Sequence, residues 1–316
     1  MLAIFGVAAS LSVLTDAERR ALPAWCQGVH VKRVDTWFTD HDGHSVRFAQ
    51  WDHPSEAFHQ FTRGLYTGLE KILPVGAIAV DIGAHSGDTT LPIALATRGG
   101  RTFAFEMGPP YSMLRCNLDL NPSLRVEAHN LAVSDRNGEV LYESGCGGCN
   151  GGVTSDGSAA KGRAKSVRLS SALPADVLGN ISFIKIDTEG HDMVILRDLK
   201  QLIQRSHPKI IVEWYAHFQD DQASACSESS MQLFNTIASI GYQALAVSSM
   251  DVAGALRNVR VVEPKRVKGR WECPKANSAG EVAQDLLLWP LHVPLWPKHT
   301  HNGQPRMGAK QGFWLG

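Results

Sequence analysis

The chain has 316 residues, 44% of them hydrophobic, which is enough to bury the core of one large domain with additions. Its 31 basic and 31 acidic side chains cancel, so it lacks the basic excess typical of proteins that bind nucleic acid, and no nucleic-acid partner is expected. The sequence contains no run of ~18 uninterrupted apolar residues, so no integral membrane segment is expected either.

The first elements predicted along the chain are a hairpin and a helix, which together form an N-terminal extension over residues 1–73. Residues 29–34 alternate between apolar and polar side chains, the Asp-Gly pair at 42–43 is a hairpin turn signal, and residues 46–51 supply the returning strand. Apolar residues at gaps of three and four then predict a helix over 54–73.

Strands and helices alternate between residues 74 and 250, which predicts an α/β core with a doubly wound (Rossmann-like), mostly parallel, seven-stranded sheet. The C-terminal segment, 251–316, contributes the last strand and a polar, glycine-rich tail. The expected strands are 77–81, 101–106, 124–133, 181–187, 209–214, 242–247 and 285–289, and the expected helices are 88–98, 110–120, 191–205 and 229–240. Ligands of such sheets bind beyond the carboxyl ends of the strands.

The six cysteines bear on the compartment. In a chain of this length without a clear signal peptide, they indicate reduced thiols and a cytoplasmic protein. Only Cys146 and Cys149 are closely spaced, and they lie in a glycine-rich loop that could cover a site. A zinc pair or a functional disulfide is the alternative to a plain flexible loop.

The strongest local signal is the segment Val80–Gly87, in which a buried strand runs into a glycine turn and then a helix. Gly83 lets the chain turn tightly and lets a ligand approach the backbone, and Gly87 opens the helix. The spacing lacks the full G-x-G-x-x-G pattern that cradles a pyrophosphate. Asp81, placed just before the turn, also disfavours a phosphate.

Glu106 ends the next strand, where a carboxylate can accept hydrogen bonds from both hydroxyls of a ribose. Together Asp81 and Glu106 indicate a site for an adenosine that carries a positive group, a description that S-adenosylmethionine fits. NAD binding and a purely structural glycine turn are the alternatives.

A third signal ends the strand 181–187, where Lys185 and Asp187 share one face of the strand. Methyl transfer requires that the acceptor be positioned in line and that its proton be removed. Asp187 is therefore the predicted catalytic group, for acceptor binding or base work, with Glu189 and Glu213 as catalytic neighbours.

Several alternatives attach to these groups. Glu189 could instead cap the following helix, and His191 or His217 could act as the base. Asp187 and Glu213 could also chelate Mg²⁺, although the sequence does not require a metal.

The stretch from about residue 74 to 214 resembles the FkbM-type methyltransferase family. The resembling segments are Val80–Gly87, Phe103–Glu106, Asn117–Asn121, Asn130–Asp135, Ile184–Gly190, Ile210–Glu213 and the late strand Asp285–Pro290. The resemblance implies an S-adenosylmethionine-dependent methyltransferase that acts on a hydroxyl of a sugar, glycan or natural product. It also implies that the late strand is antiparallel.

The resemblance also assigns roles in cofactor binding. Asp81, Gly83 and Gly87 would hold the methionine end, Glu106 would hold the ribose, and the region of Asn130 and Ala132 would flank the adenine. His85 would join the first group at a position where the family usually carries Asn. Asp192, similarly, stands where a Glu is more usual. The alternatives within this reading are an RNA or nucleotide methyltransferase on the same fold and a non-catalytic cofactor-binding scaffold protein.

Overall fold

The structure is a computed structural model of the chain. It describes residues 14–39, 44–51, 68–144, 151–154, 157, 160–213, 228–247, 261–262, 264–267, 270–272 and 285–293. Most of the expected helix 54–73, the Cys146–Cys149 pair, His217 and the tail from residue 297 lie outside the described residues. Among the described helices, none has the length and apolarity needed to cross a membrane.

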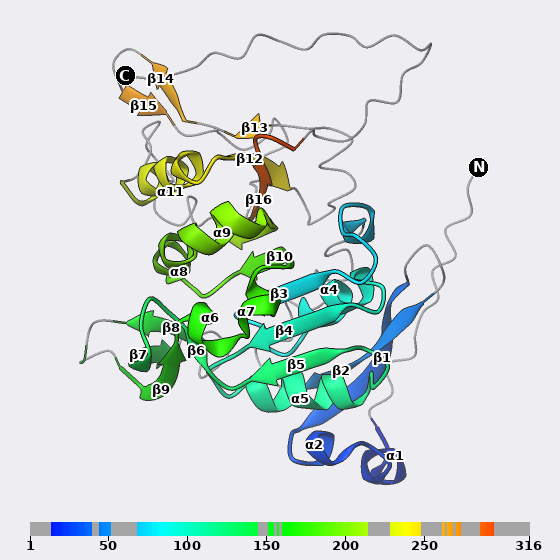
Figure 1. Ribbon diagram of the computed structural model, residues 1–316. Coiled ribbons are helices and arrows are strands. Elements are labelled where there is room, and N and C mark those ends of the chain that lie inside the picture. Colours follow the sequence, from blue (N-terminus) through cyan, green and yellow to red (C-terminus); the bar gives the residue numbers. More distant parts are fainter. Residues whose placement is uncertain are drawn as a thin grey trace, which may run out of the picture.

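The centre of the molecule is a mixed sheet of eight strands in the order β13-β12-β16-β11-β10-β3-β4-β5 (Figure 1). From β11 to β5 the neighbouring strands are parallel, whereas β16 runs antiparallel between β11 and β12. The strands are β3 (Ile78–Ile82), β4 (Arg101–Phe105), β5 (Val126–His129), β10 (Ile181–Ile186), β11 (Lys209–Glu213), β12 (Tyr242–Val247), β13 (Val261–Val262) and β16 (Asp285–Pro290).

The predicted α/β sheet and its late antiparallel strand are confirmed, but the number of strands and their mostly parallel arrangement need correction. The sheet is mixed, and β13 adds an eighth strand through two residues that pair with β12, a length at which no sequence period can be recognised. The expected strand 124–133 also divides, because β5 joins the large sheet while the residues of β6 (Ala132–Val133) pair elsewhere.

Helices cover both faces of the large sheet, and the strand period of two decides which side chains meet them. Val80 and Ile82 of β3 face one core, which is shared with α6 (Leu169–Ala172), α7 (Ala175–Leu178), α8 (Asp192–Asp198), α9 (Lys200–Ser206) and α11 (Glu228–Ser239). Ala79 faces the opposite side, where α4 (Thr90–Ala96) packs, and α5 (Tyr111–Asp119) packs beside it against Ala104. The single helix predicted over 191–205 is two helices, α8 and α9, joined at Leu199.

The glycine-rich region after β5 is more regular than predicted. It contributes a second sheet of four strands, β6-β9-β7-β8, made of β6, β7 (Gly138–Ser144), β8 (Gly151–Thr154) and β9 (Gly162–Val167). Val140 and Ala164 alternate with exposed neighbours and are buried together with Ala132. The glycine-rich loop was expected to run from Cys146 to Asp156, and this is wrong for residues 151–154, which pair with β7 as the edge strand β8 despite two glycines.

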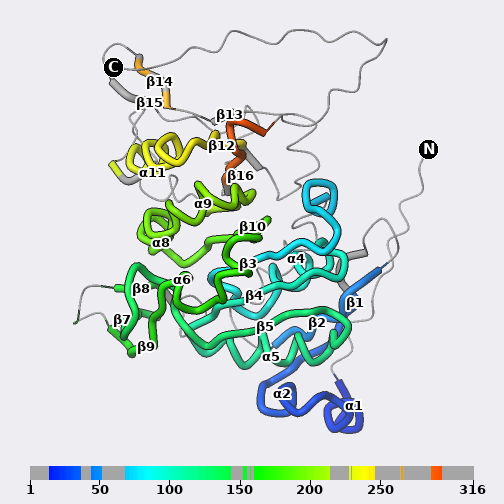
Figure 2. The backbone as a smooth tube through the Cα atoms, viewed as in Figure 1, coloured from blue at the N-terminus to red at the C-terminus, as the bar shows by residue number. Residues whose placement is uncertain are grey.

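In the described part of the N-terminal extension, two short helices, α1 (Asp16–Arg20) and α2 (Ala24–Gln27), precede the predicted hairpin of β1 (Val31–Thr39) and β2 (Ser45–Trp51). Thr15 and Glu18 form a capping box at the start of α1. The extension packs along α5 (Figure 2), where Val31 and Ala49 are buried against Met113. Further along the chain, a short 3₁₀ helix, η2 (Leu69–Lys71), precedes β3, and β14 (Lys265–Val267) and β15 (Arg270–Glu272) form a separate hairpin.

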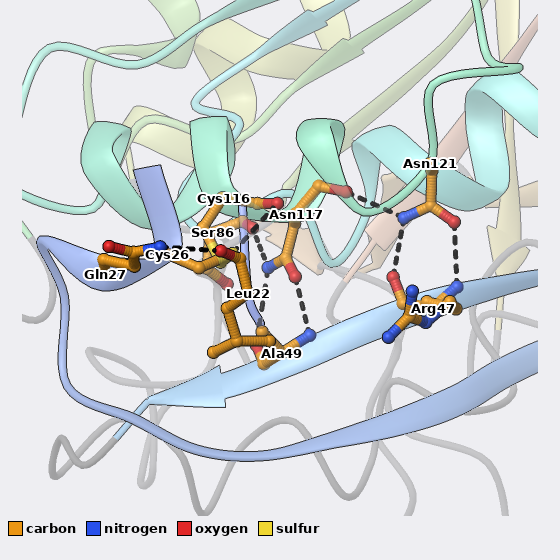
Figure 3. Close-up of a disulfide and its surroundings, with 9 residues drawn as sticks. All are labelled: Leu22, Cys26, Gln27, Arg47, Ala49, Ser86, Cys116, Asn117 and Asn121. Carbon is orange, nitrogen blue, oxygen red and sulfur yellow. Dashed lines mark hydrogen bonds between the residues drawn. A yellow bond between two sulfur atoms is a disulfide. The ribbon is translucent and has the colours of Figure 1, made fainter. Parts of the chain in front are cut away.

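A disulfide joins Cys26 of α2 to Cys116 of α5, residues that are 90 positions apart in the sequence (Figure 3). The expectation of reduced thiols is therefore wrong for this pair, and the pair no longer supports a cytoplasmic location. No sequence spacing signals such a bond, because only the packing of α2 on α5 brings the two Cα atoms to 4.5 Å. The other four cysteines lie outside the described residues.

Candidate active site

The carboxyl ends of β3, β4, β10 and β11 meet at one edge of the sheet, and the glycine turn after β3 forms its centre. The backbone N–H groups of Gly83 and Ala84 both donate to the carbonyl oxygen of Phe105, at 2.9 Å each, so the turn is fixed to the end of β4. Gly83 has φ +80°, and a Cβ there would lie 1.7 Å from the carbonyl oxygen of Asp187. Glycine is therefore needed at this position for two reasons. The chain turns tightly, as expected, and Asp187, just after β10, approaches too closely for a side chain to fit.

The other end of the turn rests on α5. Gly87 has φ +91°, and a Cβ there would come within 3.0 Å of the Leu114 side chain. His85, between the two glycines, also has a positive φ of 46°. Its ring meets the ring of Trp51 edge to face at a centroid distance of 6.2 Å, so the end of β2 reaches the turn.

Asp81 lies beneath the turn and is fully buried. Its Oδ2 atom accepts hydrogen bonds from the hydroxyls of Thr89 and Thr90, at 2.9 and 2.6 Å, which ties β3 to the start of α4. Burial raises the pKa of Asp81, and the ammonium of Lys185, 3.6 Å from Oδ1, opposes that rise. The side chain of Asp81 has no exposed surface, so it supports the turn from beneath and does not line the open side of the site.

Lys185 is a site residue for which the sequence reasoning gave no role. Its side chain is only 3% exposed, and its Nζ atom donates to the carbonyl oxygen of Gly83 at 2.8 Å and lies 3.1 Å from Oδ2 of Asp187. The shared face predicted for Lys185 and Asp187 is confirmed. The sequence did contain a signal for this role, because Lys185 stands inside an otherwise apolar strand. A buried ammonium requires carboxylates or carbonyls around it.

Glu106 follows β4 directly and is partly buried. One carboxylate oxygen accepts from the backbone N–H of His85 at 2.9 Å and the other from that of Gly108 at 2.6 Å. Asn130, which is exposed, donates from its side chain to the carbonyl oxygen of Glu106 at 2.9 Å, so the segments after β4 and β5 lie side by side. Ala132, two residues further on, is buried in the small sheet.

Asp187 and Glu213 face each other at the ends of β10 and β11. The side chain of Asp187 is 35% exposed, and Glu213 beside it is partly buried. Burial, together with the negative charge of Asp187, raises the pKa of Glu213 far above its ordinary value. At neutral pH Glu213 therefore holds its proton.

The loop Asp187–Gly190 is held by Asp192, whose carboxylate accepts from the backbone N–H groups of Thr188 and Gly190 at 3.0 and 3.1 Å. Glu189, with φ +55°, stands within this loop. Asp192, in the first turn of α8, thus binds two N–H groups of the loop that precedes its helix. The small sheet covers the loop, since a Cβ on Gly152 of β8 would lie 2.6 Å from the carbonyl oxygen of Glu189.

His191, one of the alternative bases, points to the small sheet. Its Nε2 atom lies 3.0 Å from the hydroxyl of Ser134, and burial lowers the pKa of its imidazole. The structure thus brings Asp81, Gly83, His85, Gly87, Glu106, Asp187, Glu189 and Glu213 to one edge of the sheet. Asn130 reaches this edge through Glu106, whereas Ala132 belongs to the small sheet.

A model of the methyltransferase FkbM domain matches residues 81–243, just over half of the chain. The chain belongs to the FkbM methyltransferase family. The match begins at Asp81 and takes in the glycine turn and the strand ends that carry Glu106, Asp187 and Glu213. It lies inside the core predicted for residues 74–250, whose boundaries stay a prediction.

Solved structures that are similar to this FkbM family member include other methyltransferases. Methyltransferase FkbM from Methylobacillus flagellatus KT has 16% identity and a TM-score of 0.39 over 72% of this chain, which spans about half (48%) of that protein. A precorrin-6y C5,15-methyltransferase from Geobacter metallireducens GS-15 has 14% identity and a TM-score of 0.38, with coverage of 79% and 96% of the two chains. A SAM-dependent O-methyltransferase from Thermotoga maritima has 10% identity and a TM-score of 0.38, with coverage of 78% and 68%.

No curated protein sequence matches the chain.

Proposed function

We propose that this FkbM family member transfers a methyl group from S-adenosylmethionine to a hydroxyl oxygen of a small molecule or glycan. The observation that carries the proposal is the meeting of three groups at one sheet edge: the glycine turn, the Glu106 carboxylate, and the partly exposed Asp187 beside buried Lys185. The first two suit an adenosine ligand, and the third suits an acceptor that must lose a proton.

The residues present fit the cofactor. Both oxygens of Glu106 are held by backbone N–H groups, so the carboxylate is fixed in place and its remaining lone pairs can accept from the two ribose hydroxyls. The turn 83–87, including His85, would hold the methionine end, supported from below by Asp81. Asn130 and Ala132 would border the adenine. The carboxylates of Asp187 and Glu189 favour a cationic ligand over a phosphorylated one.

When bound, S-adenosylmethionine supplies an activated methyl group on a sulfonium. Asp187 would orient the acceptor hydroxyl and accept its proton as the new O–C bond forms and the S–C bond breaks, leaving its electron pair on sulfur. Lys185 and protonated Glu213 would hold the Asp187 carboxylate at the mouth of the site. Glu189 would line the mouth beside it.

The donor set does not suit Mg²⁺ at Asp187 and Glu213. Lys185 already balances the charge of Asp187 at 3.1 Å, and burial raises the pKa of Glu213 so that it keeps its proton. A divalent cation would have to displace the Lys185 ammonium from Asp187 and the proton from Glu213. The reaction that we propose therefore uses no metal at these two residues.

Calorimetric titration with S-adenosylmethionine and S-adenosylhomocysteine tests the cofactor. We expect the unmodified protein to bind both, and Glu106→Ala to weaken binding at least tenfold, or about 1.4 kcal/mol. Glu139→Ala, which removes a carboxylate that is 60% exposed on β7, is the control and should leave affinity unchanged. A folded protein that binds neither ligand would contradict the proposal and favour a structural turn or another nucleotide.

Transfer of a labelled methyl group to a panel of hydroxylated sugars, glycans and phenolic compounds tests the chemistry. Asp187→Asn should still bind S-adenosylhomocysteine, which lacks the sulfonium charge, but should reduce the rate by about 10²–10⁴-fold, the usual contribution of a general base. An unchanged rate would remove Asp187 from that role. Label found in RNA, or cofactor binding without product on any acceptor, would instead support the nucleic-acid or scaffold alternative.

A further inference from the structure

The N-terminal hairpin lies outside the matched family segment, yet one buried side chain connects it to the glycine turn. Asn117 of α5 is fully buried. Its Oδ1 atom accepts from the backbone N–H of Ala49 in β2 at 2.7 Å, and its Nδ2 atom donates to the carbonyl oxygen of Ser86 at 2.8 Å (Figure 3). Nδ2 also approaches the carbonyl oxygen of Ala49 at 3.4 Å.

Asn121, one helical turn further along the chain, makes a matched contact without the turn. Its Oδ1 atom accepts from the backbone N–H of Arg47 at 2.8 Å, and its Nδ2 atom donates to the carbonyl oxygen of Arg47 at 2.6 Å (Figure 3). Asn117 lies in α5 and Asn121 follows the end of that helix, and the two amides meet Ala49 and Arg47, alternate residues of β2. They take the place of a neighbouring strand on the side of β2 that faces away from β1.

The two amides differ in what else they bind. The second Nδ2 bond of Asn121 goes to the carbonyl oxygen of Asn117 inside α5, at 2.7 Å. The second partner of Asn117 is Ser86, which lies between His85 and Gly87 in the turn that the proposed function assigns to the cofactor. A second contact from the hairpin reaches the same turn, because Trp51 at the end of β2 meets the ring of His85.

We infer that Asn117 is a positioning residue that holds the glycine turn in its binding conformation by tying it to the N-terminal hairpin. In this proposal the hairpin helps to position the cofactor site. The inference rests on the proposed function in so far as the turn binds S-adenosylmethionine. The turn needs such support because His85, with φ +46°, and Gly87, with φ +91°, both lie in the left-handed region.

The test compares Asn117→Ala with Asn121→Ala in the full chain. Both variants remove an amide that bonds β2, so both should lower the thermal unfolding midpoint to a similar extent. Only Asn117→Ala should raise the dissociation constants of S-adenosylmethionine and S-adenosylhomocysteine, by tenfold or more. Hydrogen exchange of the amides of residues 84–88, measured without ligand, should accelerate in Asn117→Ala and stay unchanged in Asn121→Ala.

Asn117→Asp and Asn121→Asp serve if the alanine variants fail to fold. Aspartate keeps the oxygen that accepts from β2. In Asn117→Asp, however, a second oxygen replaces the N–H donor and faces the carbonyl oxygen of Ser86, so cofactor binding should weaken. The binding should recover as the pH falls, because the protonated carboxyl can again donate to Ser86. Equal affinities, or equal losses, for the two positions would overturn the inference. If the unmodified protein binds neither ligand, the proposed function fails by itself, and the exchange rates of residues 84–88 still decide whether Asn117 holds the turn.

Discussion

The carboxylate of Asp192 links the loop Asp187–Gly190 to the pH dependence of stability. Burial, with the nearby charge of Asp187, raises its pKa from 3.8 to about 6, while the N–H groups of Thr188 and Gly190 oppose the rise. Because the folded protein holds this proton more tightly than the unfolded chain, the stabilising contribution is complete below pH 3.8 and is lost as the pH rises through about 6.

We therefore expect the free energy of unfolding of the unmodified protein, relative to that of Asp192→Asn, to fall between pH 4 and pH 7. The amide of the variant does not titrate in this range, so the fall measures the Asp192 proton alone and should reach about 3 kcal/mol at most. Urea denaturation of both proteins across this range measures it. A difference that stays constant with pH would show that Asp192 is not perturbed in the folded state.

At the scale of single residues, the sequence predicted the groups at strand ends better than the groups beneath them. Glu106 and Asp187 could be placed because the carboxyl ends of parallel strands meet at one edge. The roles of Lys185 and Asn117 could not be predicted, because they depend on atoms contributed by distant segments: Gly83 for the first, Ala49 and Ser86 for the second.

At the scale of elements, α2 depends on its disulfide. The helix has four residues and no side-chain cap, a length at which an isolated helix is unstable in water. Cys26 fixes it to Cys116 of α5 and closes a loop across 90 residues. Closing a loop of this size restricts the unfolded chain strongly, and the resulting stabilisation is typically about 2–4 kcal/mol.

The double variant Cys26→Ala, Cys116→Ala should therefore unfold with a free energy about 2–4 kcal/mol lower than that of the oxidised protein. Chemical denaturation with and without a dithiol reductant measures this. The reductant should destabilise the unmodified protein by a similar amount and leave the double variant unaffected. An unmodified protein that is insensitive to the reductant would mean that the two thiols are not bonded.

The elements that the sequence predicted poorly are those with short or non-local pairing. Alternating apolar residues revealed the hairpin β1–β2, whose strands are close in the sequence. The small sheet was not foreseen, since β6 has two residues and β8 carries two glycines that give no apolar pattern. Their pairing with β9 and β7 is fixed by contacts between segments rather than by propensity.

At the scale of the whole molecule, the hydrophobic clusters cross the boundary predicted at residue 73. Val46 and Phe48 of β2 pack with Leu91 of α4 in one cluster, in which Phe48 is 1% exposed. A second cluster combines Cys26 and Val31 with Met113 and Cys116, together with Leu22, Ala49 and Leu120. The described residues of the extension therefore share their hydrophobic clusters with the family core, and we expect the two to unfold together.

Phe48→Ala should lower the free energy of unfolding by about 3–5 kcal/mol, the usual cost of emptying a buried aromatic site. It should do so in a single transition, in which tryptophan fluorescence and far-UV circular dichroism give the same midpoint. Val75→Ala, at a side chain that is 71% exposed, is the control and should change the value by less than about 0.5 kcal/mol.

An early fluorescence transition that leaves the circular dichroism midpoint unchanged would show that the extension unfolds on its own. The family core would then stay folded after the hairpin had left, and a hairpin that holds the turn through Asn117 requires cofactor binding to be lost in that first transition. A single transition instead makes the cofactor turn, the disulfide and the hairpin parts of one cooperative unit. Phe48 lies on β2 next to Ala49, which is linked to the turn through Asn117. Phe48→Ala should then weaken cofactor binding as well as stability.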